Sequence, residues 1–266
     1  MMRTQSISAI PARVEPVFPS VALPHSGPRR RQPAGGEGAF LGILMLDSRF
    51  PRPLGDIGHP ESFPVPTRRV VVSGATAPKV VQDAPALAAG GLLRAFTEAA
   101  CRLEREGAAA ITTSCGFLVL FQRELQMAVR LPVVTSSLLM LPGLLEAHRQ
   151  VGVLTISSDF LGAQHLEAAG VPPDRLGDVI VQGVEPRGEF ASVILENRTR
   201  MDMAKAASEV VEAARNLKQR VPSLSTLVLE CTNLPPYARK IEEATGLRTL
   251  SLLQCETLLD PFGVAP

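Results

Sequence analysis

Residues 110–136 of the chain read AITTSCGFLVLFQRELQMAVRLPVVTS, and residues 226–252 read TLVLECTNLPPYARKIEEATGLRTLSL. The two stretches align without a gap at an offset of 116 residues, which pairs Cys115 with Cys231. Each contains an apolar run, a helical pattern and a second apolar run, so each predicts a strand, a helix and a strand. The repeat therefore indicates two related α/β halves.

The same alternation continues on both sides of the repeat, from residue 40 to the C-terminus. Apolar runs at 40–46, 69–74, 150–157 and 178–184 predict further strands, and segments 84–105, 159–170 and 189–220 have helical spacing. Strands that are apolar throughout are typical of parallel sheets covered on both faces.

We therefore predict an α/β fold of two pseudo-symmetric three-layer lobes with parallel sheets and the active site in the cleft between them. The first lobe comprises residues 39–147 plus 249–266 and carries Cys115. The second comprises residues 148–248 and carries Cys231.

The first 38 residues are rich in Pro, Gly and Arg and have no apolar period, which predicts a disordered extension. A scarcity of acidic residues leaves an organellar transit peptide open, although the prolines would break an amphipathic helix. In the chain as a whole the net charge is +1 and no apolar run is long enough for a membrane helix. We expect no nucleic-acid or membrane partner, and homo-oligomerisation is left open.

The four cysteines and four histidines are widely spaced, without a CxxC pair, so they give no local signature of a metal site. Without a secretory signal, we expect reduced thiols and a cytoplasmic protein. Cys101 and Cys255 lie in predicted apolar helices and are expected in the core.

Cys115 and Cys231 each follow a predicted strand and precede a predicted helix. Because the carboxyl ends of parallel strands carry the chemistry in such sheets, two thiols at matching strand ends are expected to flank one cleft. The helix N-terminus should lower their pKa and equip them as an acid and a base. The alternatives are two small buried side chains, or a disulfide if their Cα atoms lie within about 7 Å.

The motifs "SCGF" and "ECTN", each ending a strand, and "LDS" after the first strand resemble the aspartate/glutamate racemase superfamily. This group includes amino-acid and hydantoin racemases, maleate cis–trans isomerases and arylmalonate decarboxylases. The resemblance implies two α/β lobes, no metal or pyridoxal phosphate, and a small carboxylate substrate. It also implies that Cys115 and Cys231 are the acid/base pair that removes and returns an α-proton.

The resemblance further implies that Asp47 lies near a thiol, that Ser48 lies near the substrate and that Thr232 helps to hold its carboxylate. Independently, short hydroxyls and N–H groups stabilise a carbanion next to a carboxylate, although the same residue types also cap helices. The full predicted substrate-binding set is Asp47, Ser48, Arg49, Ser114, Gly116, Thr135, Ser136, Thr232 and Asn233.

The loop after residue 46 carries two arginines, Arg49 and Arg52, either of which could bind a second substrate carboxylate. Asp56 and His59 stand in the same loop, but without a third ligand we do not expect them to hold a metal.

Three positions depart from the racemase pattern. Gly116 stands where the racemases usually have Asn, Asn233 where they commonly have His, and Glu230 where a small residue is usual. The main expectation is a cofactor-independent two-cysteine racemase or epimerase of an amino acid or amino-acid derivative. The alternatives are a maleate-type cis–trans isomerase with a nucleophilic cysteine, and a catalytically silent binding protein on the same scaffold.

Overall fold

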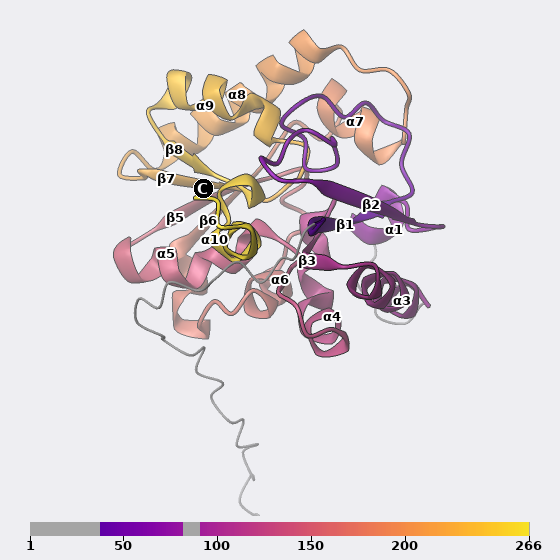
Figure 1. Cartoon of the computed structure of the whole chain (residues 1–266). Coiled ribbons are helices and arrows are strands. Elements are labelled where there is room, and N and C mark those ends of the chain that lie inside the picture. The colour runs from indigo at the N-terminus through magenta and orange to yellow at the C-terminus, as the bar shows by residue number, and fades with distance from the viewer. Residues whose placement is uncertain (1–37, 82–90, 266) are drawn as a thin grey trace, which may run out of the picture. The chain divides into compact units, whose positions relative to one another are not determined.

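Two four-stranded parallel sheets form the framework of the part of the chain that the structure describes, residues 38–81 and 91–265 (Figure 1). The structure is a computed structural model, and these residues lie within one unit, Gln32–Pro266. The first sheet has the order β2-β1-β3-β4 and the second the order β6-β5-β7-β8. The strands are β1 (Phe40–Leu46), β2 (Thr67–Val72), β3 (Ala108–Thr113), β4 (Val133–Val134), β5 (Val151–Thr155), β6 (Val179–Gly183), β7 (Thr226–Leu229) and β8 (Arg248–Leu250).

Helical segments connect the strands of both sheets except β1 and β2, which are joined by the loop at 47–66, and the predicted α/β class is confirmed. The α-helices are α1 (Ala77–Val81), α3 (Leu92–Arg105), α4 (Gln122–Ala128), α5 (Leu141–Ala147), α6 (Ala163–Ala168), α7 (Glu189–Leu195), α8 (Met203–Arg220), α9 (Ala238–Thr245) and α10 (Glu256–Leu259). Short 3-10 turns are η1 (Gly116–Phe121), η2 (Ser137–Met140), η3 (Pro173–Asp178), η4 (Pro235–Tyr237), η5 (Leu252–Gln254) and η6 (Asp260–Phe262).

The two sheets have the same strand order, and β1 of the first sheet corresponds to β5 of the second. These two strands also pack in the same way. Gly42 in β1 and Gly152 in β5 occupy corresponding positions. A Cβ at Gly42 would approach Leu103 of α3 to 2.8 Å, and one at Gly152 would approach Leu217 of α8 to 3.0 Å. In each sheet a long helix thus packs closely against this strand, and glycine leaves the space that a leucine side chain of the helix occupies.

The predicted helical region 189–220 is two helices, α7 and α8. Asn197 ends the first segment with a left-handed backbone at φ 56°, a conformation that Asn tolerates better than most residues. Asp202 then starts α8 by accepting hydrogen bonds from the N–H groups of Ala204 and Lys205. The spacing of apolar residues is helical throughout this segment, so it did not reveal the break between α7 and α8.

Other predicted helices differ at their ends. The segment predicted to start at residue 159 becomes helical only at Ala163, because Gly162 is extended and its N–H bonds to Nδ1 of His165. The last predicted helix divides into η5 and α10, with Cys255 buried at the junction. The predicted extension, apart from Gly38, and the start of the helix predicted at 84–105 lie outside the described residues.

The C-terminal segment returns from the second sheet to the first. β8 pairs with β7, whereas Leu252, Leu258 and Leu259 join a buried cluster with Leu41 and Ile43 of β1. The predicted division at residue 249 falls inside β8, so the return to the first sheet begins after that strand. No helix in the described ranges is both long and apolar enough to cross a bilayer.

Candidate active site

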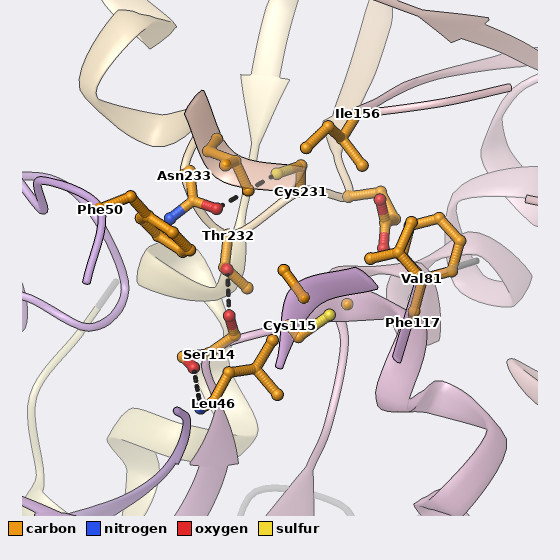
Figure 2. Close-up of a pocket in the computed structure, with 14 residues that line it drawn as sticks. Leu46, Phe50, Val81, Ser114, Cys115, Phe117, Ile156, Cys231, Thr232 and Asn233 are labelled. Atoms are coloured by element: carbon orange, nitrogen blue, oxygen red, sulfur yellow. Dashed lines mark hydrogen bonds between the residues drawn. The ribbon is translucent and has the colours of Figure 1, made fainter. Parts of the chain in front are cut away.

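A small pocket lies between the strand ends of the two sheets, with a cavity volume of about 20 Å³ (Figure 2). Both cysteines that end β3 and β7 line it, with Ser114, Gly116, Glu230, Thr232 and Asn233 from the same two loops. The remaining wall is apolar and includes Leu46, Phe50, Val81, Phe117, Ile156 and Ile194. A largely apolar lining with a few polar groups is typical of a site for a small ligand, and the walls must move apart to admit one larger than water.

Cys115 and Cys231 come from equivalent positions of the two halves, as the repeat predicts. Cys115 precedes η1 in an extended conformation, and Cys231 is separated from the end of β7 by one residue, Glu230. Both are 7% exposed, and all four cysteines of the chain are free thiols. The two pocket thiols are close enough that a charge on Cys115 raises the pKa of Cys231.

The expectation that a helix N-terminus lowers the pKa of these thiols is wrong. Burial, and then the negative charge of Glu230, raises the pKa of Cys115 to about 12, although the N–H groups of Phe117 and Leu118 act in the opposite direction. The pKa of Cys231 is raised well above its usual value by the same two causes in the same order. Cys115 precedes only the short 3-10 turn η1, and Cys231 lies four residues before η4, so loss of hydration outweighs the few backbone N–H groups near each thiol.

Glu230 is a buried carboxyl group in the wall of the pocket. Its side chain is 1% exposed, Oε2 accepts a hydrogen bond from Thr155 Oγ1 at 2.6 Å, and Oε1 has no partner. Burial raises its pKa to about 7, partly offset by the bond from Thr155. Glu230 is therefore the pocket group with a pKa near neutrality, because both thiols titrate far above it.

The two cysteine loops cross and contact each other at the pocket. Thr232 Oγ1 donates a hydrogen bond to the carbonyl oxygen of Ser114 at 2.6 Å, and Ser114 Oγ accepts one from the N–H of Leu46 at 2.9 Å (Figure 2). In the other direction, the space that a Cβ at Gly116 would occupy is filled by the carboxyl and carbonyl groups of Glu230. Glycine at position 116 thus allows the two loops to approach each other, because any side chain there would collide with Glu230.

Asn233 connects Cys231 to a buried ion pair. Its Oδ1 accepts from the Cys231 thiol at 3.5 Å, and its Nδ2 donates to Asp56 at 2.5 Å. Asp56 is fully buried and accepts from Arg52 at 2.7 Å and from the N–H of Gly58 at 2.7 Å. The carboxylate fixes the amide with its oxygen toward the sulfur, so Asn233 orients the thiol hydrogen of Cys231.

Three predicted residues of the loop after β1 lie outside the pocket lining. Asp47 accepts from the N–H of Gly74 at 3.1 Å. Ser48 accepts from Arg52 at 3.0 Å, and Arg49 is exposed with its backbone N–H bonded to Asn197 at 2.6 Å. These contacts support the loop behind the site, and a direct role with substrate stays a prediction for all three.

Thr135 and Ser136 are buried one layer behind the cysteine loops. Thr135 Oγ1 donates to Gln122 at 2.7 Å, and its carbonyl accepts from Thr113 Oγ1 at 2.7 Å. Ser136 caps η2 by accepting from the N–H of Leu138. Of the predicted substrate-binding set, Ser114, Gly116, Thr232 and Asn233 are brought together with the cysteines in the pocket.

The sequence predicted no role in the site for the residues of the apolar wall or for Glu230. It also did not predict that Asp56 binds Asn233 and Arg52. Glu230 carried a signal, since a lone acid ends an otherwise apolar strand in "TLVLECTN". The wall residues carried none, because Phe50 and Ile156 resemble ordinary core residues. In the described ranges, no three His, Cys, Asp or Glu side chains are grouped so that they could hold a metal ion.

The sequence profile of Asp/Glu/hydantoin racemases matches residues 58–256. Dimethylsulfoniopropionate lyase of Durusdinium sp. clade D is 30% identical over 239 residues, which cover 82% of this chain and 74% of that protein. Dimethylsulfoniopropionate lyase 3 of Emiliania huxleyi (strain CCMP1516) is 30% identical over 225 residues, covering 81% and 57%. The chain therefore spans little more than half the length of this second relative.

Among solved structures, unliganded arylmalonate decarboxylase is similar with a TM-score of 0.51 and 16% identity, covering 85% of this chain and 92% of that one. Aspartate racemase of Picrophilus torridus has a TM-score of 0.50 and 14% identity, covering 85% and 95%. These likenesses concern the fold alone, and they agree with the α/β class. The family profile matches most of the length of this chain, and the chain therefore belongs to the Asp/Glu/hydantoin racemase family.

Proposed function

We propose that this chain is a cofactor-independent lyase that removes a proton next to a carboxylate and expels a sulfide from the neighbouring carbon. Dimethylsulfoniopropionate, on which its relatives are named to act, is the type of substrate. The observation that carries the proposal is a small, largely apolar pocket with two thiols and one buried carboxyl group. It supplies a proton acceptor next to surfaces that suit methyl groups.

The reaction balances without an oxidant, a reductant or water. A base takes a proton from C2 of the substituted propionate, and the C–H electron pair forms the C2–C3 double bond. The C3–S bond breaks with its electrons remaining on sulfur. The products are dimethyl sulfide and acrylate, and the proton stays on the base until it passes to solvent.

The base in this scheme is one of the two thiols. Both are neutral in the empty pocket, because burial and Glu230 raise the pKa of each. A positively charged substrate stabilises a thiolate beside it, so ionisation of the base accompanies binding of the substrate. For the substrate carboxylate we assign Ser114, whose hydroxyl accepts from Leu46 N–H and keeps its proton to donate.

The test is release of dimethyl sulfide from dimethylsulfoniopropionate, measured by headspace gas chromatography, with acrylate quantified by liquid chromatography. An elimination needs a base on one face only, so Cys115→Ala and Cys231→Ala should be unequal. The variant that removes the base should lose about 10²- to 10⁴-fold in rate, the usual contribution of such a group. Cys255→Ala is the matched control, because Cys255 is equally buried but belongs to the cluster against the first sheet. Absence of both products with the unmodified protein would refute the proposal.

Racemisation is the second candidate, favoured by the equivalent positions of Cys115 and Cys231. It requires an acid and a base on opposite faces, so both alanine variants should lose activity equally. Proton NMR in heavy water would detect it as loss of the α-proton signal of aspartate or glutamate. The pocket lining in the described ranges includes no Lys or Arg to hold a second carboxylate, which disfavours these diacids.

A further inference from the structure

Glu230 is unusual among the pocket residues because its carboxyl group is buried and only half satisfied. Thr155 supplies one hydrogen bond to Oε2, while Oε1 has no partner. A buried carboxyl oxygen without a partner costs free energy, and a carboxyl group with a purely structural role usually has both oxygens bonded. Glu230 is the only carboxyl group among the described residues that line the pocket.

We propose that Glu230 is the subsite for the cationic group of the substrate, and that this group is a trialkyl onium such as a sulfonium. This inference rests on the proposed function and deepens it by naming the residue that recognises the positive end of the substrate. The carboxyl group lies against Gly116 of the opposite loop, where it fills the space that a side chain would take. It therefore stands at the contact of the two loops that carry the thiols.

The surroundings favour an onium group over a primary ammonium group. An ammonium has three N–H donors, each of which needs an acceptor once it is removed from water. The pocket wall consists mainly of apolar side chains such as Val81, Phe117, Ile156 and Ile194. The methyl groups of an onium pack against such a wall without unsatisfied donors, and aromatic rings attract its charge. One carboxylate then balances the charge.

The charge of Glu230 responds to the ligand. Burial raises its pKa to about 7, so at neutral pH an empty pocket holds this group only partly ionised. The thiols of Cys115 and Cys231 face it and are neutral, because their pKa values lie far higher. Behind them, Arg52 acts on Cys115 and Asp56 acts on Cys231. A bound cation favours the ionised carboxylate, and the same electrostatic field favours a thiolate.

The experiment compares two unreactive ligands of the same shape. One is 3-(trimethylammonio)propionate, whose amine leaves far less readily than a sulfide, and the other is 4,4-dimethylpentanoate, its isostere with carbon in place of the cationic nitrogen. Titration calorimetry at pH 8 should give at least tenfold tighter binding of the cation to the unmodified protein. The Glu230→Gln variant should bind both ligands alike. An affinity for 4,4-dimethylpentanoate at least equal to that of the unmodified protein would show that the pocket is intact, because loss of the Glu230 charge removes a repulsion on this anion.

Three results would overturn the inference. These are equal binding of both ligands by the unmodified protein, failure of both to bind, and cation preference that persists in Glu230→Gln. A third probe, 3-aminopropionate, tests the onium part, since equally tight binding of this ammonium compound would refute it. The outcome is separable from the lyase assay. Dimethyl sulfide release without cation preference contradicts only the role of Glu230, and cation preference without release contradicts only the lyase.

Discussion

Replacing Glu230 with Gln should stabilise the folded protein, and the gain should increase with pH. Glu230 is 1% exposed and leaves Oε1 without a partner, so ionising it in the folded state is costly. Glutamine has nearly the same shape and carries no charge to bury. The variant therefore isolates the cost of holding a carboxylate in the pocket.

The sign and size follow from the two pKa values of Glu230. Burial raises its pKa to about 7 in the folded protein, against 4.5 in an unfolded chain. Since the folded state binds the proton more tightly, rising pH favours unfolding between these values. The penalty is absent below about pH 4.5 and complete above about pH 7. The difference, 7 − 4.5 = 2.5, corresponds to about 3 kcal/mol at 1.36 kcal/mol per pKa unit.

Urea unfolding of both proteins from pH 5 to pH 8.5 measures this directly. The difference in unfolding free energy, variant minus unmodified protein, should rise by about 2 to 3 kcal/mol across this range, because part of the penalty is already present at pH 5, and it should level off above pH 7. Glu146→Gln is the control, because Glu146 is exposed and its replacement should give no such rise. A flat difference, or one that falls with pH, would refute the reasoning that Glu230 is held against an unfavourable burial cost.

Three further experiments test the contacts around the pocket. Gly116→Ala should lower the unfolding free energy by about 1–3 kcal/mol in urea and reduce lyase activity, because the added methyl group meets Glu230; an unaffected variant would contradict the close contact. Asp56→Asn should cost about 3–5 kcal/mol in the same assay, because it leaves Arg52 nearly buried without its counter-charge; a cost below about 1 kcal/mol would mean that the pair is hydrated. In the Glu230→Gln variant both pocket thiols should react faster with iodoacetamide at pH 8, measured by mass spectrometry, since removal of the buried charge lowers their pKa; unchanged rates would mean that burial alone sets it.

The fold was predictable because the repeat fixes two strand–helix–strand units in register. The cysteines mark equivalent strand ends, and Gly42 and Gly152 mark equivalent packing of a long helix on a strand. Residue spacing was less informative at helix ends. There the outcome depends on single caps such as Asp202, and such residues are equally common in loops.

The site was only partly predictable, because its chemistry depends on contacts between distant segments. Asp56 reaches Asn233 across 177 positions of sequence, and nothing in the Pro- and Gly-rich loop around Asp56 indicates that partner. The direction in which the thiol pKa values are shifted was predicted wrongly for the same reason. Motif position predicted a helix N-terminus, whereas the dominant effects are burial and the charge of Glu230, which depend on how tightly the loops cross.

The unlike residues of the two cysteine loops would also set which way round the proposed substrate lies. Two identical halves would present the same groups to both ends of a molecule and could not tell head from tail. Here Ser114 of one half corresponds to Glu230 of the other, and Gly116 corresponds to Thr232. A hydroxyl group therefore faces an acid across the pseudo-dyad. Joining both halves in one polypeptide permits this polarity, because each copy can mutate without changing its counterpart.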